Sequence, residues 1–366
     1  MSRGKAVVAM SGGVDSSVAA ALMVEAGYDV TGVMLKLWRG AAANNESGCC
    51  NLSAADDARR VADVLGIRFY VLNFAERFTD TVIADFHAAY ASGTTPNPCV
   101  RCNQWVKFGA LLERAETLGA GLLATGHYAR IRRDGGSSRL LRGADPAKDQ
   151  SYVLWMLTQS QLARSAFPVG EMDKSRTRAI AAELGLRTAE KPDSQEICFV
   201  RRGDMDAYVG EHMPEAARSG AIVDMAGREV GRHRGIGRYT VGQRRGLGVS
   251  LGAPVFVNSI DAAGNTVRVG PRSALRVAGF EAAEASFVRG SGRRMRVAVQ
   301  HRAHGEVHAG VLTGVAPGRV RVDYDEPVEA VAPGQSAAFY ALPRGDELLG
   351  GGVIASAFPA DEAAAL

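Results

Sequence analysis

Apolar residues in the first third of the chain form short runs of strand length that alternate with stretches of helix length. The expected strands span residues 5–10, 29–37, 68–74 and 121–125, and the expected helices span residues 18–26 and 53–65, with Ser53 as an N-cap. Strands that alternate with helices predict an α/β fold with a parallel, doubly wound sheet. In such a sheet, ligands bind beyond the carboxyl ends of the strands.

The pattern changes after about residue 200, where helical periodicity fades and glycine and arginine become more frequent. Short apolar runs separated by Pro-Gly turns then predict a small C-terminal β-barrel or sandwich, with strands at residues 295–300, 307–313, 319–324, 336–340 and 350–355. We therefore expect a catalytic domain at residues 1–200, a small central domain at 201–276 and the β-barrel at 277–366.

Composition places the chain among ordinary globular proteins, with 366 residues, 46% hydrophobic and 22% charged. No apolar run reaches the roughly 18 residues that a membrane helix needs. The first residues, Met1 to Lys5, carry no signal-peptide pattern, so we expect a cytoplasmic protein.

The net charge of +4 is small, but its distribution is uneven. Six arginines lie within residues 228–245, and five lie within residues 289–302. Such clusters attract a phosphate backbone, although a solvated surface can have the same composition.

The first expected strand runs directly into Ser11-Gly12-Gly13-Val14-Asp15-Ser16-Ser17 and then into a helix. Glycines allow close backbone approach to a ligand, and the amino end of the helix attracts anions, so the segment is a candidate phosphate loop. The lysine of the GxxxxGK[ST] loop is absent. The SGGVDSS segment resembles the pyrophosphate (PP) loop of the ATP pyrophosphatases, which split ATP into AMP and pyrophosphate.

Five cysteines, at positions 49, 50, 99, 102 and 198, argue against a disulfide framework in a chain without a signal sequence. Cys99 and Cys102 form a CxxC motif that we expect just before a helix starting near Asn103, where a thiol would have a lowered pKa. Three interpretations remain open. Cys102 and Cys198 handle sulfur as a redox pair, or Cys99, Cys102 and Cys198 hold an iron–sulfur cluster or zinc, or the cysteines are structural. We expect the adjacent Cys49 and Cys50 to be structural.

These motifs together resemble the bacterial tRNA-specific 2-thiouridylases over nearly the whole length. The blocks that carry the resemblance are AMSGGVDSSV, TPNPCVRCN, ATGHYAR, KDQSYVL, DSQEICFV, YTVGQRRGLG and DEPVEAVAPGQSAAFY. The resemblance implies that ATP adenylates O2 of the wobble uridine U34 and that Cys198 carries persulfide sulfur. It also implies that Cys102 acts as a nucleophile and that a transient Cys102–Cys198 disulfide remains.

The resemblance also assigns binding residues and cofactors. ATP would contact Ala9, Met10, Ser11, Gly12, Gly13, Val14, Asp15, Ser16, Leu35 and Gly126, with Asp15 helping to hold Mg2+. The transfer RNA would contact Asn97, Pro98, Cys99, Lys148, Asp149, Gln150, Arg302 and Ala303. Some family members carry Asp where this chain has Cys99, and others an aromatic residue where it has Ala303. Cys99 is therefore a further candidate catalytic residue, in an acid–base role or as a ligand of a [4Fe-4S] cluster.

Local chemistry offers simpler interpretations of some of these residues. His127 could be a hydrogen-bonded histidine at a strand end, and Lys148-Asp149-Gln150 could be an ordinary helix start. The expected partners are the transfer RNAs for Lys, Glu and Gln and a cysteine desulfurase or sulfur-relay protein, with the chain acting as a monomer. Rival functions are an amide-forming ATP pyrophosphatase, a cluster-dependent thiolase and a non-catalytic RNA-binding protein.

Overall fold

The computed structural model describes residues 3–37, 52–193, 197–200, 203–290 and 293–360. Cys49 and Cys50 lie outside the described residues. The chain divides into two compact units, which are described separately. Unit 1 comprises Met1–Val82, Cys99–Arg202 and Asp346–Leu348, and unit 2 comprises Ile83–Pro98, Gly203–Gly345 and Leu349–Leu366. The predicted boundaries near residues 200 and 276 remain a prediction.

Unit 1 is built on a five-stranded sheet whose order is β3-β2-β1-β4-β7 and whose pairings are all parallel. The strands are β1 (Lys5–Ala9), β2 (Asp29–Lys36), β3 (Arg68–Asn73), β4 (Leu122–Ala124) and β7 (Ser165–Ala166). The chain builds outward from β1 through β2 to β3, and then returns to place β4 on the other side of β1. This reversal beside β1 is the position where open α/β sheets bind ligands.

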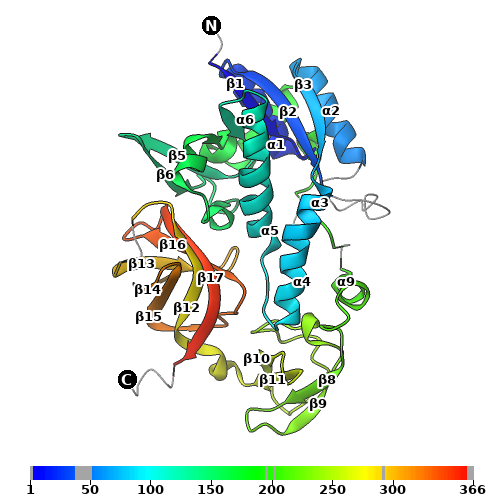
Figure 1. The fold of residues 1–366 in the computed structure, drawn as a ribbon, viewed down its shortest axis with the longest axis vertical. Helices are drawn as coiled ribbons and strands as arrows, with labels where there is room; N and C mark the ends of the chain where they lie inside the picture. Colours follow the sequence, from blue (N-terminus) through cyan, green and yellow to red (C-terminus); the bar gives the residue numbers. More distant parts are fainter. Residues whose placement is uncertain (1–2, 38–51, 194–196, 201–202, 291–292, 361–366) are drawn as a thin grey trace. The chain divides into compact units, whose positions relative to one another are not determined.

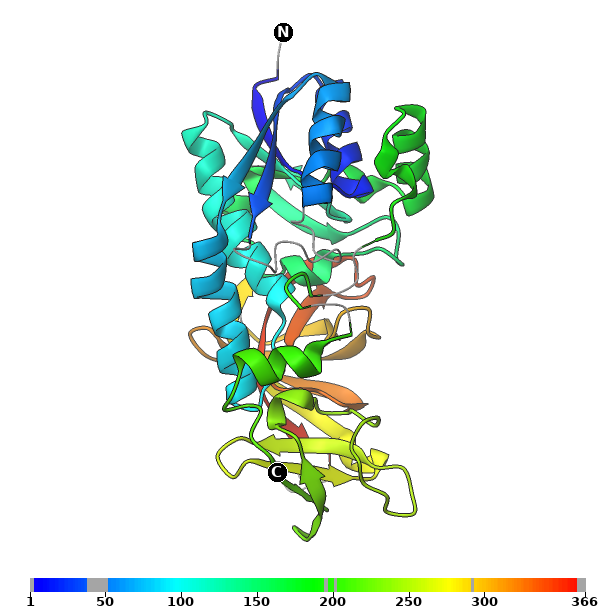
Figure 2. The same cartoon turned by 90° about the vertical axis from the view of Figure 1, so that its right-hand side faces the viewer.

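Helices α1 and α2 pack against this sheet. Figures 1 and 2 both place the blue helices α1 and α2 beside strands β1 and β2. The helical segments up to residue 200 are α1 (Val14–Glu25), α2 (Leu52–Leu65), α3 (Ala75–Phe78), η2 (Thr79–Ile83), α4 (Ala84–Ala91), α5 (Pro98–Arg101), η3 (Cys102–Leu111), α6 (Leu112–Thr117), η4 (Ser151–Leu154), α7 (Gln159–Ala163), η5 (Pro168–Glu171), α8 (Lys174–Glu183) and η6 (Arg187–Glu190).

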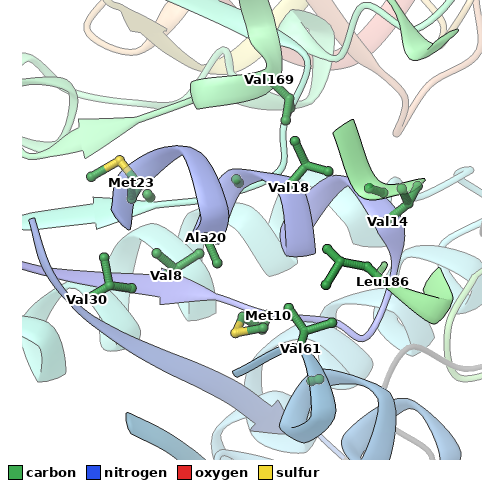
Figure 3. Close-up of a cluster of buried hydrophobic side chains, with 14 of the residues drawn as sticks. Val8, Met10, Val14, Val18, Ala20, Met23, Val30, Val61, Val169 and Leu186 are labelled. Carbon is green, nitrogen blue, oxygen red and sulfur yellow. The ribbon is translucent and has the colours of Figure 1, made fainter. Parts of the chain in front are cut away.

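Helix α1 is buried on most of its circumference, which explains why its sequence is apolar rather than amphipathic. Figure 3 shows Val14, Val18 and Met23 of α1 within a cluster of buried side chains that also includes Val8 and Leu186. Full burial of a valine side chain such as Val18 stabilises the fold by about 1.5–3 kcal/mol. This packing fixes the start of α1, and hence the loop before it, against the sheet.

Unit 2 contains a four-stranded sheet of order β10-β11-β8-β9 and a closed six-stranded barrel, β12-β15-β14-β13-β16-β17, in which β12 also pairs with β17. Figure 1 shows the barrel strands in yellow to red. The segments after residue 203 are α9 (Met205–His212), β8 (Gly220–Val223), β9 (Glu229–His233), η7 (Ile236–Arg238), β10 (Phe256–Asp261), β11 (Thr266–Gly270), η8 (Arg272–Leu275), β12 (Arg276–Phe287), β13 (Met295–Gln300), β14 (His308–Ala316), β15 (Arg319–Glu329), β16 (Ser336–Ala341) and β17 (Glu347–Pro359).

The predicted fold class, a parallel α/β sheet followed by a C-terminal barrel, is confirmed. Two local predictions are wrong. Helix α2 begins at Leu52, so Ser53 lies inside the helix and is not its N-cap. The helix expected to start near Asn103 begins at Pro98, because proline suits the first turn of a helix, where its missing N–H costs no hydrogen bond.

The sequence pattern also missed a β-hairpin, formed by β5 (Ala129–Asp134) and β6 (Ser137–Arg142). Within unit 1, β6 pairs with the first residues of β17, so that Leu141 lies opposite Glu347. Charged residues along β5 hid its strand character, since Arg130, Arg132 and Arg133 interrupt the apolar pattern.

Candidate active site

The predicted phosphate loop lies between β1 and α1, at the carboxyl edge of the central strand. Gly12 has a φ of 71°, and a Cβ placed there would lie 2.3 Å from the Ala54 carbonyl oxygen, so this position requires glycine. Gly13 is the N-cap of α1 and provides no side-chain cap. The first N–H groups of a helix have no intrahelical partner, so the start of α1 can donate hydrogen bonds to an anion.

The serines of the loop brace its backbone. The hydroxyl groups of Ser16 and Ser17 donate to the Gly13 carbonyl oxygen at 3.1 and 2.9 Å. The Ser11 amide in turn donates to the Ser16 hydroxyl oxygen at 3.1 Å. These bonds close the loop on itself, so its shape is formed before any ligand arrives.

Two of the predicted ATP contacts, Leu35 and Gly126, come from the strands that flank β1. Gly126 follows β4, and a Cβ at this position would lie 2.7 Å from the Asp15 carbonyl carbon and the Ser16 amide nitrogen. The backbone after β4 therefore touches the start of α1 and leaves no room for a side chain. Leu35 lies near the carboxyl end of β2 and is 8% exposed. The structure thus brings Gly126 to the loop and places Leu35 at the same edge of the sheet.

Asp15 belongs to a charged network that the sequence analysis did not find. Both of its carboxylate oxygens accept hydrogen bonds from Lys174 Nζ, at 2.6 and 2.8 Å, and one also accepts from the Tyr128 hydroxyl at 2.8 Å. Lys174 forms a second ion pair with Asp193 at 2.7 Å, and Asp193 pairs in turn with Lys148 at 2.8 Å. The side chain of Lys174 is only 12% exposed, so this lysine is held between two carboxylates.

The network shifts the pKa values of its members in the expected directions. Burial alone would raise the pKa of Asp193, but hydrogen bonds from Lys148 and Lys174 outweigh this and lower it. The hydrogen bond to Asp193 raises the pKa of Lys148. Burial raises the pKa of the Tyr128 hydroxyl, which therefore stays protonated and donates to Asp15.

The segment that carries Cys198 contacts the phosphate loop region at two points. Lys191 Nζ donates to the Gly12 carbonyl oxygen at 3.0 Å and pairs with Asp57 at 2.8 Å. Asp193 is linked to Asp15 through Lys174. The charged residues of the Lys191-Pro192-Asp193 sequence are the signal that could have indicated these contacts.

The Lys148-Asp149-Gln150 segment is held by unit 1 itself. The Asp149 carboxylate accepts hydrogen bonds from the Arg142 guanidinium at 2.6 Å and from the Gly143 and Ser151 amides. Gln150 exchanges two hydrogen bonds with the backbone of Tyr128. Asp149 and Gln150 therefore shape this turn, and their contact with RNA remains a prediction.

His127 lies in the environment of a hydrogen-bonded histidine just after a strand end. It is buried, and its Nδ1 lies 2.6 Å from the Thr125 hydroxyl oxygen. Burial, with a smaller contribution from the charge of Lys107, holds the pKa of His127 well below its usual value. A neutral, hydrogen-bonded imidazole at the end of β4 is a structural element of the sheet edge.

The three candidate cysteines differ in environment. Cys99 is exposed in the first turn of α5, Cys102 is buried at the start of η3, and Cys198 is partly buried. Because the helix starts at Pro98, its positive end acts on Cys99 rather than on Cys102. Arg101 is 8% exposed, and its guanidinium carbon lies over the Trp105 ring, 4.8 Å from the ring centre.

The cluster interpretation has no support in the part of the chain that the structure describes. There, no group of three or more His, Cys, Asp or Glu side chains lies close enough to hold a metal ion.

Unit 2 holds the remaining predicted RNA contacts. Arg302 Nη2 donates to the Glu329 and Ala330 carbonyl oxygens, each at 3.2 Å, and Ala303 is exposed. Within the first arginine cluster, four members pair with acids, namely Arg228, Arg232, Arg234 and Arg238. Arg244 and Arg245 are exposed. None of the helices in the described ranges is both long enough and apolar enough to span a membrane.

The fold and the loop together define an α/β nucleotide-binding protein with a C-terminal barrel. Three family models match it in succession. They are the tRNA methyl transferase HUP domain over residues 4–202, the tRNA methyl transferase PRC-barrel domain over residues 206–271 and the aminomethyltransferase beta-barrel domain over residues 277–354.

Relatives with curated names show to which family within this class the chain belongs. The tRNA-specific 2-thiouridylase MnmA of Roseiflexus castenholzii is 49% identical over 96% of this chain and 99% of its own length. The proteins of the same name from Geotalea uraniireducens and Chloroflexus aurantiacus are 47% and 49% identical, over 96% and 95% of this chain and 95% and 98% of their own lengths. The chain belongs to the family of tRNA-specific 2-thiouridylases.

Proposed function

We propose that the protein is a tRNA-uridine 2-sulfurtransferase, which uses ATP to replace O2 of the wobble uridine U34 by sulfur. The observation that carries this proposal is the match, over 96% of the chain, to relatives named for this activity. The uncapped start of α1 and the braced glycine loop support it, because they suit the pyrophosphate group of ATP.

ATP would occupy the carboxyl edge of the sheet. The residues proposed to bind it are Ala9, Met10, Ser11, Gly12, Gly13, Val14, Asp15, Ser16, Leu35 and Gly126. Asp15 supplies the carboxylate oxygens that Mg2+ prefers, and its side chain is 31% exposed. Bound Mg2+ would neutralise phosphate charge and would share its coordination shell with the oxygens of ATP. Lys174 balances the charge of Asp15 in the absence of the ion.

The proposed reaction has two stages. The O2 atom of U34 attacks the α-phosphorus of ATP, pyrophosphate leaves, and C2 then carries AMP as a good leaving group. The terminal sulfur of a Cys198 persulfide is delivered to C2, and the C2–O2 bond breaks as AMP departs with that oxygen. The Cys102 thiolate attacks the Cys198 sulfur, so that 2-thiouridine and a Cys102–Cys198 disulfide result. A thiol reductant must reduce this disulfide before the next turnover.

Cys99 is proposed as an acid–base residue or a base contact. It is exposed and lies in the first turn of α5, where a base could reach it. With Asn97 and Pro98, it would contact the target base, which must be flipped out for its 2-position to be reached. Lys148, Asp149 and Gln150 together with Arg302 and Ala303 are the proposed contacts to the body of the RNA.

The proposal also covers the substrates, the sulfur donor, the location and the domain boundaries of the protein. The substrates are transfer RNAs for Lys, Glu and Gln, a cysteine desulfurase or sulfur-relay protein supplies the sulfur, and the protein acts as a cytoplasmic monomer. The proposed domain boundaries are residues 1–200, 201–276 and 277–366, with the central domain contacting RNA. The three matched family models cover closely similar ranges and support this division.

A reaction with purified protein, unmodified tRNA, magnesium, ATP and a sulfur donor tests this function. We expect 2-thiouridine and AMP in equal amounts, and no 2-thiouridine with a tRNA that carries cytidine at position 34. An amide-forming ATP pyrophosphatase would make no 2-thiouridine, and an RNA-binding protein without catalysis would release no AMP. Either result would overturn the proposal.

A further inference from the structure

The loop before α5 contains two prolines, Pro96 and Pro98, and leads directly into the CxxC motif. Proline has no N–H group, so this segment has few donors with which to fix its own backbone. Its carbonyl oxygens need donors from elsewhere, because a loop that must align a substrate base cannot be left unanchored. Those donors come from parts of unit 2 that are distant in sequence.

Gln335 provides the side-chain anchor. Its Nε2 donates to the carbonyl oxygens of Thr95 and Pro96, at 3.1 and 3.3 Å. The backbone of Gln335 is itself fixed, because its carbonyl oxygen accepts from the Ile354 amide of β17 at 2.8 Å. One amide group on the barrel thus holds two successive carbonyl groups of the proline loop.

The residues before Gln335 provide a backbone anchor. The Thr95 amide donates to the Pro333 carbonyl oxygen at 2.8 Å. Gly334 has a φ of 89°, and a Cβ there would lie 2.7 Å from the Thr95 amide nitrogen. The Pro333-Gly334 turn, which the sequence suggested only as a break between strands, therefore lies directly against the loop.

A second support comes from the segment that begins at Thr240. The Thr95 hydroxyl donates to the Thr240 hydroxyl oxygen at 3.3 Å. Gln243 fixes Thr240 through two hydrogen bonds. The side-chain Oε1 of Gln243 accepts from the Thr240 backbone amide at 3.1 Å, and the backbone amide of Gln243 donates to the Thr240 carbonyl oxygen at 3.0 Å. The blocks YTVGQRRGLG and DEPVEAVAPGQSAAFY thus meet at one residue, Thr95.

We propose that Gln335 is a positioning residue for the target base, acting through the loop at Thr95 and Pro96 that leads to Asn97. Gln335 does not act on the RNA directly, and Thr240 assists it from the second segment. The inference rests on the proposed function, since it assigns the loop to the wobble uridine. It gives the APGQ and TVGQ segments a role in catalysis that neither the phosphate loop nor the cysteines supply.

The test compares Gln335→Met with a matched control. Methionine keeps the side-chain length and removes both hydrogen bonds to the loop. Gln159→Met is the control, because Gln159 Nε2 also donates to a backbone carbonyl, that of Ser138, at 2.8 Å, outside the proposed machinery. For Gln335→Met we expect kcat for 2-thiouridine formation to fall about 10- to 100-fold, with KM for tRNA within about threefold of wild type. The control should retain wild-type kcat.

A double-mutant cycle separates positioning from a general loss of stability. If Gln335 acts through the loop, its effect and that of Asn97 should not add. The kcat of the double variant Asn97→Ala/Gln335→Met should then lie within about threefold of the kcat of the less active single variant. Multiplicative losses in the double variant, or an unchanged kcat in Gln335→Met, would overturn the proposal. Should Gln335→Met fail to fold, Thr240→Val removes the second support and should lower kcat in the same direction; an unchanged kcat there counts equally against it.

Hydrogen exchange provides a readout that does not depend on catalysis. In free protein, the peptide containing Thr95 should exchange faster in Gln335→Met than in wild type or Gln159→Met, because the Thr95 amide loses the anchoring of its loop. Wild-type protein that makes no 2-thiouridine would contradict the proposed function alone. Unchanged exchange at Thr95 would contradict the anchoring by Gln335, whatever the activity.

Discussion

At the scale of single residues, Lys174 does more than balance one charge. Its ammonium group contacts both Asp15, at the start of α1, and Asp193, five residues before Cys198. Lys174 therefore links the region that would bind ATP to the segment before Cys198, in addition to the contact that Lys191 makes with the Gly12 carbonyl oxygen. Pairs this sheltered depend on both partners, because removing one leaves the other charge poorly solvated.

Replacing Lys174 by methionine should therefore destabilise unit 1. We expect the free energy of unfolding in urea to fall by about 1–3 kcal/mol, below the value for a fully buried pair because Asp15 and Asp193 are 31% and 22% exposed. Arg176→Met on the same helix is the control. Arg176 and its partner Glu183 are 55% and 62% exposed, so this change should cost no more than about 0.5 kcal/mol. Equal losses in the two variants would contradict the role given to Lys174.

The lowered pKa of Asp193 predicts in which direction the stability of the fold changes with pH. Hydrogen bonds from Lys148 and Lys174 outweigh burial and hold its folded-state pKa below the usual value for aspartate, so its ionised form stabilises the fold above that value. This contribution is lost as pH falls from about 4 through the lower folded pKa. Asp193→Asn should therefore lose less stability than wild type between pH 5 and pH 3, measured by thermal unfolding. Parallel pH profiles would show that Asp193 is not the titrating group.

At the scale of elements, the helix begins at Pro98, so Cys99 rather than Cys102 lies at its start. Cys99 is exposed in the first turn of α5, whereas Cys102 lies one turn further along and is 9% exposed. Any activation of Cys102 must therefore come from its neighbours or from the bound substrates, and not from the end of the helix.

Alkylation rates test this assignment. With iodoacetamide and free protein, Cys99 should react at least about tenfold faster than Cys102, because it is exposed and lies at the positive end of α5. Peptide mass spectrometry over a time course measures both rates in one sample, and unfolded protein provides the control in which the two rates converge. Faster reaction at Cys102 would mean that the native helix does not start at Pro98.

At the scale of the whole molecule, the sequence predicted those parts that depend on local pattern. Continuous apolar runs identified β1 and β2, and the glycines after β1 identified the phosphate loop at its observed place. The β-strands between residues 220 and 270 were missed, because β8 and β9 are short and are interrupted by glycine and charged residues.

Contacts between distant segments could not be predicted from spacing. Lys174 and Asp193 show no pattern that ties them to Asp15, and Gln335 lies 240 positions after Thr95. Such pairs become visible only when the fold brings their elements together. Segment 83–98 likewise has its contacts with unit 2, most of which lies more than 100 positions further along the chain.

The central claim is that Cys198 carries the sulfur that reaches U34, and the Cys198→Ser variant tests it most directly. Wild type and variant would receive ATP, magnesium, a sulfur donor and unmodified tRNA, with AMP, 2-thiouridine and tRNA binding measured separately. The account predicts that Cys198→Ser binds tRNA as wild type does and forms no 2-thiouridine. If 2-thiouridine is still formed by this variant, Cys198 is not the carrier and the persulfide mechanism is wrong.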